Sequence, residues 1–298
     1  KEVKSMKKFK RILLIIIVIF GIFAVSGCKK KETEQQRVEK IITEVYKTHR
    51  GTFIMYTIDD IVFDYNAIAA ITLLNKKGYD FDLTKVLAEE LVVRHINNAE
   101  IKSENDAFKL MILAKAYNLE MPSKVVDYTA NLTQASSFYA YPVILSLIEN
   151  FKNNDALLNQ ILAAIPTVHT NDWFDTDTAA FILATTTKYD NVDKSNLQTL
   201  LDDATTVDGV LGWDGKYSAS STAMALIANT SNGKMVSFSG ESNLADALVK
   251  FYDAEQKGFK SNLEAEEIDV TFATPQAFAA LSLYLLMLKG EKAPNLYY

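Results

Sequence analysis

The chain has few of the residues that carry covalent or metal chemistry. Only one of its 298 residues is a cysteine, Cys28, which excludes an internal disulfide. No thiol remains downstream of it to act as a nucleophile or to hold zinc. The three histidines, His49, His95 and His169, lie far apart and lack the spacing of metal ligands. We therefore expect no metal and no other cofactor, and a fold that depends on its hydrophobic core.

Several other patterns are missing. No sustained alternation of apolar and polar residues predicts a sheet. The sequence contains no phosphate-binding loop, dinucleotide fingerprint or nucleophile elbow. Acidic residues outnumber basic ones by 37 to 31, and the formal charge is −6. Because an acidic protein repels a phosphate backbone, we expect no nucleic-acid partner.

Residues 1–27 have the composition of a secretory signal. Basic residues at 7–11 precede an uncharged apolar run at 12–25, which is shorter than the roughly 20 residues of a spanning helix. Ser26, Gly27 and Cys28 follow and resemble a bacterial lipobox. The resemblance implies cleavage before Cys28, a diacylglyceryl group on its thiol, and a location on the extracytoplasmic face of the cell membrane. An uncleaved membrane anchor is the alternative.

The rest of the chain divides into a short tether and one large domain. Residues 28–36 comprise the modified cysteine and a polar tract that we expect to be a tether. Removing residues 1–27 leaves 25 basic and 36 acidic residues, so the mature protein is strongly acidic. Its membrane contact should therefore come from the acyl chains on Cys28. Residues 37–298 form the expected domain.

Two kinds of helical pattern alternate in residues 37–298. One kind is amphipathic, with apolar residues three and four apart, at 38–48, 83–97, 123–132, 154–164, 195–204 and 243–253. The other is rich in alanine and apolar on nearly every side, at 65–71, 106–114, 141–147, 178–184, 222–228 and 275–281. The second kind recurs about every 35 to 50 residues, a spacing typical of stacked helix pairs.

This alternation predicts an all-α fold. A helix that is apolar all round must be buried, whereas one with a polar face lies outside. Six of each predict an α/α toroid with six inner and six outer helices, and an open solenoid of helical hairpins is the alternative. We expect Asp177 or Thr178, Ser221 or Thr222, and Thr274 to cap the last three inner helices.

Motifs in the second half of the chain resemble a known superfamily. Three segments at the starts of predicted inner helices, 175–180, 220–225 and 273–277, follow one pattern, and glycine-aromatic loops at 208–215 and 257–260 precede two of them. Together they resemble the repeats of the terpenoid cyclase and protein prenyltransferase superfamily. The nearest branch is that of bacterial surface lipoproteins with prenyltransferase-like repeats, related in fold to the cobalamin-binding intrinsic factor and transcobalamin. The resemblance implies the same toroid.

The resemblance also limits the chemistry. Prenyltransferases use a zinc-binding Cys, and complement-type thioester proteins need a Cys in the toroid, which this chain lacks. Class II terpene cyclases protonate an alkene with the middle Asp of Asp-x-Asp-Asp-Thr-Ala. Here Asp177 matches that residue, but Thr178 stands where the motif has its next Asp. If the protein is an enzyme, a glycan hydrolase or lyase or a degenerate cyclase, its candidate acids are Asp177, Asp175 and Asp64.

In a toroid the inner-helix N-termini converge on one face, where unpaired N–H groups favour anionic or polar ligand groups. We therefore expect a non-catalytic binding protein that takes a small molecule, glycan or peptide at this face. An enzyme on the same face and a cell-surface scaffold for protein interactions are the alternatives. The expected ligand-binding residues are Asp64, Asn66, Asp106, Tyr139, Trp173, Asp175, Asp177, Thr178, Trp213, Ser221, Thr222, Thr274 and Gln276.

Replacing the lipobox cysteine tests the expected lipid anchor and membrane location. Cys28→Ala should abolish labelling by a fatty-acid probe and leave the protein unprocessed or soluble, because the acylated thiol is lost. Cell fractionation with lipid labelling measures both effects, and labelling equal to that of the wild type would contradict the lipobox.

Overall fold

Most of the residues that the computed structural model describes, 32–57, 60–240 and 242–298, are helical, as the periodicity predicts. Residues from Val38 to Tyr298 form one compact unit. The expected signal sequence and Cys28 lie outside the described residues. Within these ranges, no helix combines the length and the apolar character needed to cross a membrane.

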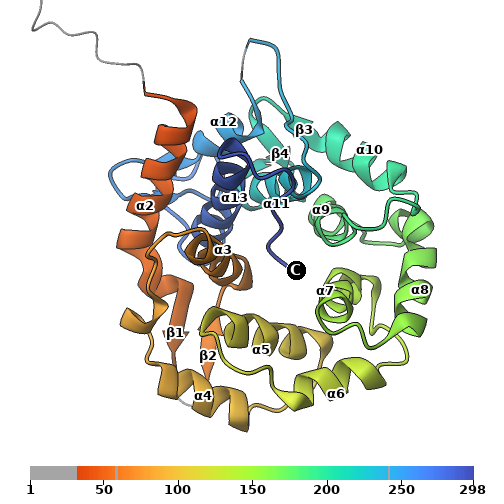
Figure 1. Cartoon of the computed structure of the whole chain (residues 1–298). Coiled ribbons are helices and arrows are strands. Elements are labelled where there is room, and N and C mark those ends of the chain that lie inside the picture. The colour runs from red at the N-terminus through yellow and green to blue at the C-terminus, as the bar shows by residue number, and fades with distance from the viewer. Residues whose placement is uncertain (1–31, 58–59, 241) are drawn as a thin grey trace, which may run out of the picture. The chain divides into compact units, whose positions relative to one another are not determined.

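Six central helices coincide with the six alanine-rich stretches. Each packs against the next in the sequence, and the last packs against the first, so their contacts form a closed cycle (Figure 1). Burial explains their composition, since every residue of the fifth helix except Ser220 is buried. The central helices are α3 (Tyr65–Lys76), α5 (Glu104–Ala116), α7 (Tyr141–Phe151), α9 (Thr176–Thr185), α11 (Ala219–Ser231) and α13 (Ala273–Leu288).

Amphipathic helices alternate with these along the chain and bury only one stripe. In α10, for example, Leu197 and Leu201 are buried one turn apart, and the remaining side chains are at least partly exposed. The helices α4 to α10 of this set lie outside the central ones in Figure 1. The set consists of α2 (Glu34–Phe53), α4 (Glu89–Asn98), α6 (Ser123–Asn131), α8 (Asp155–Ala164), α10 (Ser195–Ala204) and α12 (Leu244–Val249).

The bounds of three expected segments differ. Helix α2 begins at Glu34, so the expected tether ends earlier than residue 36. The expected helix 83–97 is split, because the Asp82 side chain caps a separate 3-10 turn, η1 (Leu83–Lys85), before α4. The expected helix 243–253 ends at Val249, since the following residues pair as a strand. Two further 3-10 turns are η2 (Phe138–Ala140) and η3 (Ile165–Thr170).

Short antiparallel strands precede three central helices, where the sequence predicted almost none. Strands β1 (Ile54–Tyr56) and β2 (Ile61–Phe63) pair before α3. Strands β3 (Thr205–Thr206), β4 (Gly209–Leu211) and β5 (Tyr217–Ser218) form a small sheet before α11. Strands β6 (Tyr252–Asp253) and β7 (Gly258–Phe259) pair before α13. Segments of two or three residues are too short to produce a recognisable alternation.

The glycine-aromatic loops share one contact with the helices that follow them. The backbone N–H of Val210 donates to the Thr222 hydroxyl, and that of Phe259 donates to the Thr274 hydroxyl, each at 2.9 Å. A Cβ added at Gly209, whose φ is +117°, would lie 2.6 Å from Thr222 Oγ1. Glycine therefore permits the close approach, and the repeated motif fastens each loop to its inner helix.

The C-terminal tail, residues 290–298, enters the middle of the ring of central helices and ends there (Figure 1). Tyr297 is fully buried, its ring contacts Phe108 and Phe181, and its hydroxyl donates to Asn66 Oδ1 at 2.7 Å. The Ser146 hydroxyl donates to the Tyr297 carbonyl at 2.7 Å. The tail therefore fills the space between the central helices.

Truncating Tyr297 should test this filling. We expect Tyr297→Ala to lower the free energy of unfolding by about 3 to 5 kcal/mol, because a large buried ring is lost and a cavity remains. Tyr297→Phe keeps the ring and should cost only about 1 kcal/mol for the lost hydrogen bond. Urea unfolding measures both changes, and similar small losses for the two variants would contradict a packed tail.

Candidate functional site

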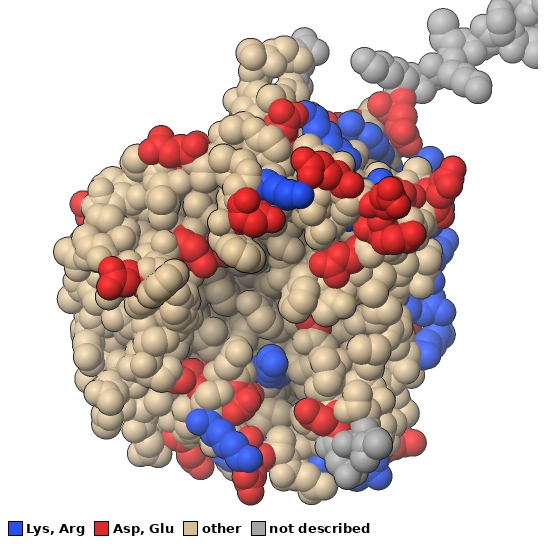
Figure 2. Space-filling view, turned by 180° about the vertical axis from the view of Figure 1, so that it is seen from behind, with Lys and Arg blue, Asp and Glu red and all other residues tan. Residues whose placement is uncertain are grey.

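A cavity of about 690 Å³ lies where the N-terminal ends of the six central helices meet. Figure 2 views the protein from this side and shows a hollow near its middle. We call it the axial cavity. Its lining comprises Tyr65, Ser103, Glu104, Asn105, Ser136, Ser137, Tyr139, Ala140, Pro142, Val143, Asp177, Thr178, Phe181, Ser220, Met224, Phe272 and Gln276.

Four of the expected ligand-binding residues line this cavity: Tyr139, Asp177, Thr178 and Gln276. Sequence reasoning missed most of the apolar lining residues. The sequence feature that could have identified them is a spacing of four residues, which places two side chains one turn apart on the same face of a helix. The pairs Asp177 and Phe181 on α9, Ser220 and Met224 on α11, and Phe272 and Gln276 at the start of α13 all show it.

Asp177 is the most unusual polar residue of the cavity. Its Oδ1 atom is buried and has no hydrogen-bond partner. Burial raises the pKa of its carboxyl from 3.8 to about 6, against an opposing hydrogen bond from Ser221, and the negative charge of Asp175 raises it further. At neutral pH the cavity therefore contains a poorly solvated carboxylate with an open acceptor site.

Gln276 supplies a second open acceptor. Its Oε1 atom, on α13, is also buried without a hydrogen-bond partner. Buried polar atoms in folded proteins are nearly always paired, so each exception requires an explanation. The two exceptions belong to side chains on different helices that line one cavity, which makes this cavity the candidate site for a group that donates hydrogen bonds.

The other carboxylate of the lining is already engaged. Glu104 is 6% exposed and accepts hydrogen bonds from the backbone N–H and the hydroxyl of Ser136, at 2.8 and 3.0 Å. It thereby fixes the loop before α7 at the cavity wall. No Lys, Arg or His occurs among the lining residues that the structure describes, so the two carboxylates give the cavity a negative character.

The helix N-termini differ from the expectation. The caps of α9 and α11 are Asp175 and Ser218, three residues earlier than Thr178 and Ser221, and they accept from the N–H groups of those two residues at 2.7 and 3.1 Å. The earlier cap leaves Asp177 inside the first turn, where its side chain reaches the cavity. Helix α13 begins at Ala273, so Thr274 is not its cap.

Caps also occupy the starts of other central helices. Asp64 accepts from the N–H of Ala67 at 2.8 Å, and Ser103 accepts from the N–H of Asp106 at 3.3 Å. The Asp269 carboxylate accepts from the backbone before α13. The donors that we expected to bind an anionic group are therefore largely occupied by side chains of the protein.

The remaining expected ligand residues have other positions. Asn66, Thr222 and Thr274 are buried and hydrogen-bonded within the fold, as described above. Asp64 and Asp175 act as caps, and Ser221 lies behind Asp177. The indoles of Trp173 and Trp213 are 89% and 99% exposed and do not line the cavity, although the Tyr139 hydroxyl donates to the Trp173 carbonyl at 2.7 Å.

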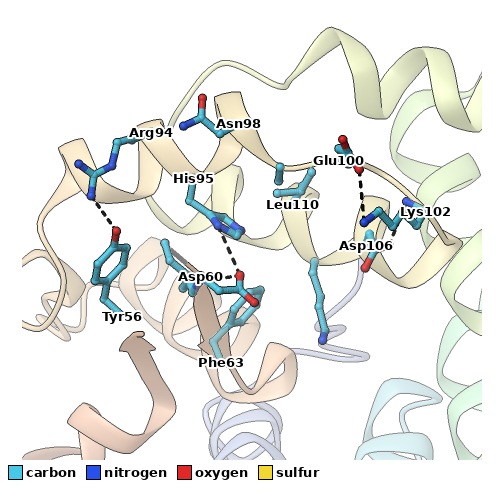
Figure 3. Close-up of a pocket in the computed structure, with 13 residues that line it drawn as sticks. Tyr56, Asp60, Phe63, Arg94, His95, Asn98, Glu100, Lys102, Asp106 and Leu110 are labelled. Carbon is cyan, nitrogen blue, oxygen red and sulfur yellow. Dashed lines mark hydrogen bonds and ion pairs between the residues drawn. The ribbon is translucent and has the colours of Figure 1, made fainter. Parts of the chain in front are cut away.

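Asp106 lines a different cavity, of about 760 Å³, between β1, β2, α4 and α5 (Figure 3). Several of its polar groups contact each other: Arg94 donates to the Tyr56 hydroxyl at 2.8 Å, and His95 lies 3.6 Å from Asp60. Asp106 accepts from Ser103 and from the backbone of Lys102, and Lys109 on α5 also lines this cavity. In contrast to the axial cavity, its described lining includes no buried polar atom that lacks a hydrogen-bond partner.

No family model matches the chain, and no curated protein or solved structure matches it either. Among the described residues, no group of three or more His, Cys, Asp or Glu side chains could hold a metal ion.

Removing the charge of Asp177 should stabilise the protein at neutral pH. A carboxyl whose pKa is raised by folding contributes stability below its ordinary pKa of 3.8 and loses it as pH rises through about 6. Asp177→Asn should therefore raise the free energy of unfolding by about 1 to 3 kcal/mol at pH 7.5 and change it little at pH 4. Urea unfolding at both pH values measures this difference.

Asp175→Ala serves as the matched control. It removes the exposed cap two residues away and should destabilise the protein by about 1 kcal/mol at pH 7.5. A loss of stability in Asp177→Asn comparable to that of the cap variant would show that Asp177 is a structural residue.

Proposed function

We propose that this protein is a lipid-anchored extracytoplasmic binding protein, built as an α/α toroid, that takes a small molecule or peptide in the axial cavity without catalysis. The single observation that carries the proposal is the pair of buried, unpartnered acceptors, Asp177 Oδ1 and Gln276 Oε1, on the wall of that cavity. The lipid anchor and the extracytoplasmic location are proposed from the lipobox-like sequence that ends at Cys28.

The contacts of the central helices support the toroid over an open solenoid. In an open solenoid each helix pair contacts only its neighbours in sequence, and the first and last pairs are far apart. Here α13 packs against α3, about 200 positions earlier in the chain. The alternation of buried and amphipathic helices, and the repeated contact of Thr222 and Thr274 with their loops, also support the resemblance to terpenoid cyclase and prenyltransferase repeats.

The use of the carboxylates favours binding over hydrolysis or cyclisation. A glycoside hydrolase needs two acids that can act on one bond. Of the acids considered, Asp64 and Asp175 are occupied as caps and neither lines the cavity, while Glu104 is held by Ser136. Asp177 alone has an open oxygen there. One open carboxyl beside an amide oxygen provides recognition but no acid–base pair.

A thermal-shift screen of the whole chain in detergent tests the proposal. The panel contains corrinoids, glycans, isoprenoids, amines, carboxylates and short peptides. We expect at least one class to raise the melting temperature, since binding to the native state stabilises by about 2.7 kcal/mol at a hundredfold excess over the dissociation constant. The shift should be lost in Asp177→Ala and in Gln276→Ala.

Asp172→Ala is the control for this screen. Asp172 is an exposed residue of the loop before α9 and does not line the axial cavity, so its loss should leave the shift intact. Shifts that survive both cavity variants would place the ligand elsewhere. If no compound shifts the melting temperature, the small-molecule proposal is wrong, and the alternative of a cell-surface scaffold for protein interactions is favoured.

A further inference from the structure

We infer that the ligand of the axial cavity carries a protonated amino group, which Asp177 and Gln276 receive beside the rings of Tyr65 and Phe181. This inference rests on the proposed binding function and narrows it to a chemical class. It differs from the expectation of an anionic ligand at helix N-termini.

The open hydrogen-bonding groups select for a donor. Both unpartnered atoms, Asp177 Oδ1 and Gln276 Oε1, can only accept hydrogen bonds. An ammonium group supplies three donors and no acceptor, so it is the kind of partner that both acceptors lack. A carboxylate or phosphate supplies no donor in its ionised form and would leave both atoms unpaired.

The charge of the cavity points the same way. Its described lining contains Asp177 and Glu104 and no basic side chain. An anion placed here would be desolvated beside a carboxylate without a counter-charge, which is strongly unfavourable. The starts of four central helices are already capped, because Asp64, Ser103, Asp175 and Ser218 each accept from one first-turn N–H group, whereas α7 has no side-chain cap.

Aromatic rings complete a site for a cation. Tyr65 and Phe181 both line the cavity and stack with ring centroids 5.9 Å apart at an angle of 15°. Phe272, 60% exposed, and Tyr139 lie on the same lining. Aromatic rings attract a cation by about 0.5 to 2 kcal/mol, more when water is excluded, and they also accommodate an apolar body attached to the amine.

Matched ligands separate the head group from the body. Tryptamine, indole-3-ethanol and indole-3-acetate share an indole and carry an ammonium, a hydroxyl and a carboxylate; phenethylamine, 2-phenylethanol and phenylacetate form a second series. Isothermal titration with the whole chain in detergent at pH 7.5 should show the amine binding at least tenfold more tightly than its carboxylate in at least one series. The alcohol should lie between them.

Two charge variants make the assignment specific. Asp177→Asn keeps the shape of the side chain but removes its charge, and should weaken amine binding at least tenfold. Gln276→Glu adds a carboxylate at the second acceptor and should strengthen amine binding. Asp172→Asn removes an exposed carboxylate outside the cavity and should leave the affinity for the amine unchanged. Thermal melts of each variant establish that it is folded.

The pH dependence provides a third readout. Amine binding should weaken as pH falls through about 6, where the Asp177 carboxyl becomes protonated, and Asp177→Asn should abolish this change. The groups that face Asp177 are Asp175 on its own helix, Ser221 on α11 and Tyr65 on α3, with Glu104 across the cavity. None of these groups is cationic; the nearest cation that acts on this region is Lys109 on α5, whose charge acts on Asp64 at the start of α3.

The outcomes are distinguishable from failure of the binding function. Tighter binding of a carboxylate or an alcohol than of its amine, lost in Asp177→Asn, would overturn the inference while leaving the cavity as a binding site; an alcohol preference would point to a sugar. Failure of both amines to bind at millimolar concentration would also overturn it. The wider screen decides separately whether the cavity binds any ligand.

Discussion

The packing of α13 against α3 is the contact on which the rest of the structure depends. A helix that is apolar on nearly every side must be buried, because at the edge of a helix array one apolar side would be exposed to water. The closed cycle gives each such helix two central neighbours. Closure also brings six helix starts to one place, which creates the axial cavity. On the inside of the ring, Tyr297 fills the space that the small alanine side chains leave.

Under the proposed function, helix capping and ligand recognition compete for the same residues at this face, and the observed caps lie two and three positions before Asp177 and Ser221. Asp175 and Ser218 satisfy the first N–H groups of α9 and α11, and this releases Asp177 and Ser220 to line the cavity. Had the caps been Asp177 and Ser221, the cavity would have lost its open carboxyl. The protein's own side chains therefore partly neutralise the positive ends of α9 and α11. The carboxylate of Asp177, the second residue of α9, then contributes to the negative charge of the cavity.

The sequence predicted what depends on periodicity. All six central helices were located because alanine-rich apolar stretches must be buried. The bounds of the outer helix α10, Ser195–Ala204, were predicted without error because its apolar stripe is regular. Residues whose roles depend on distant partners were not predictable. Nothing local indicates that Tyr297 meets Asn66, that Gln276 lacks a partner, or that the Trp213 side chain projects into solvent. Thr222 and Thr274 were recognised as a repeat, but their hydroxyls hold loops, a function that a motif alone does not distinguish from ligand binding.

A comparison with another buried carboxylate, Glu149, supports the proposed role of Asp177 in binding. Glu149 is 4% exposed at its side chain, and although burial raises its pKa, hydrogen bonds from Lys152, Tyr189 and Lys188 lower it to about 2. That carboxylate is fully compensated and contributes to the fold. Asp177 has no cationic partner: one of its oxygens lacks a hydrogen bond, and burial raises its pKa to about 6 although a hydrogen bond from Ser221 opposes the shift. A group that weakens the fold and faces a cavity is explained when something outside the chain supplies the missing partner.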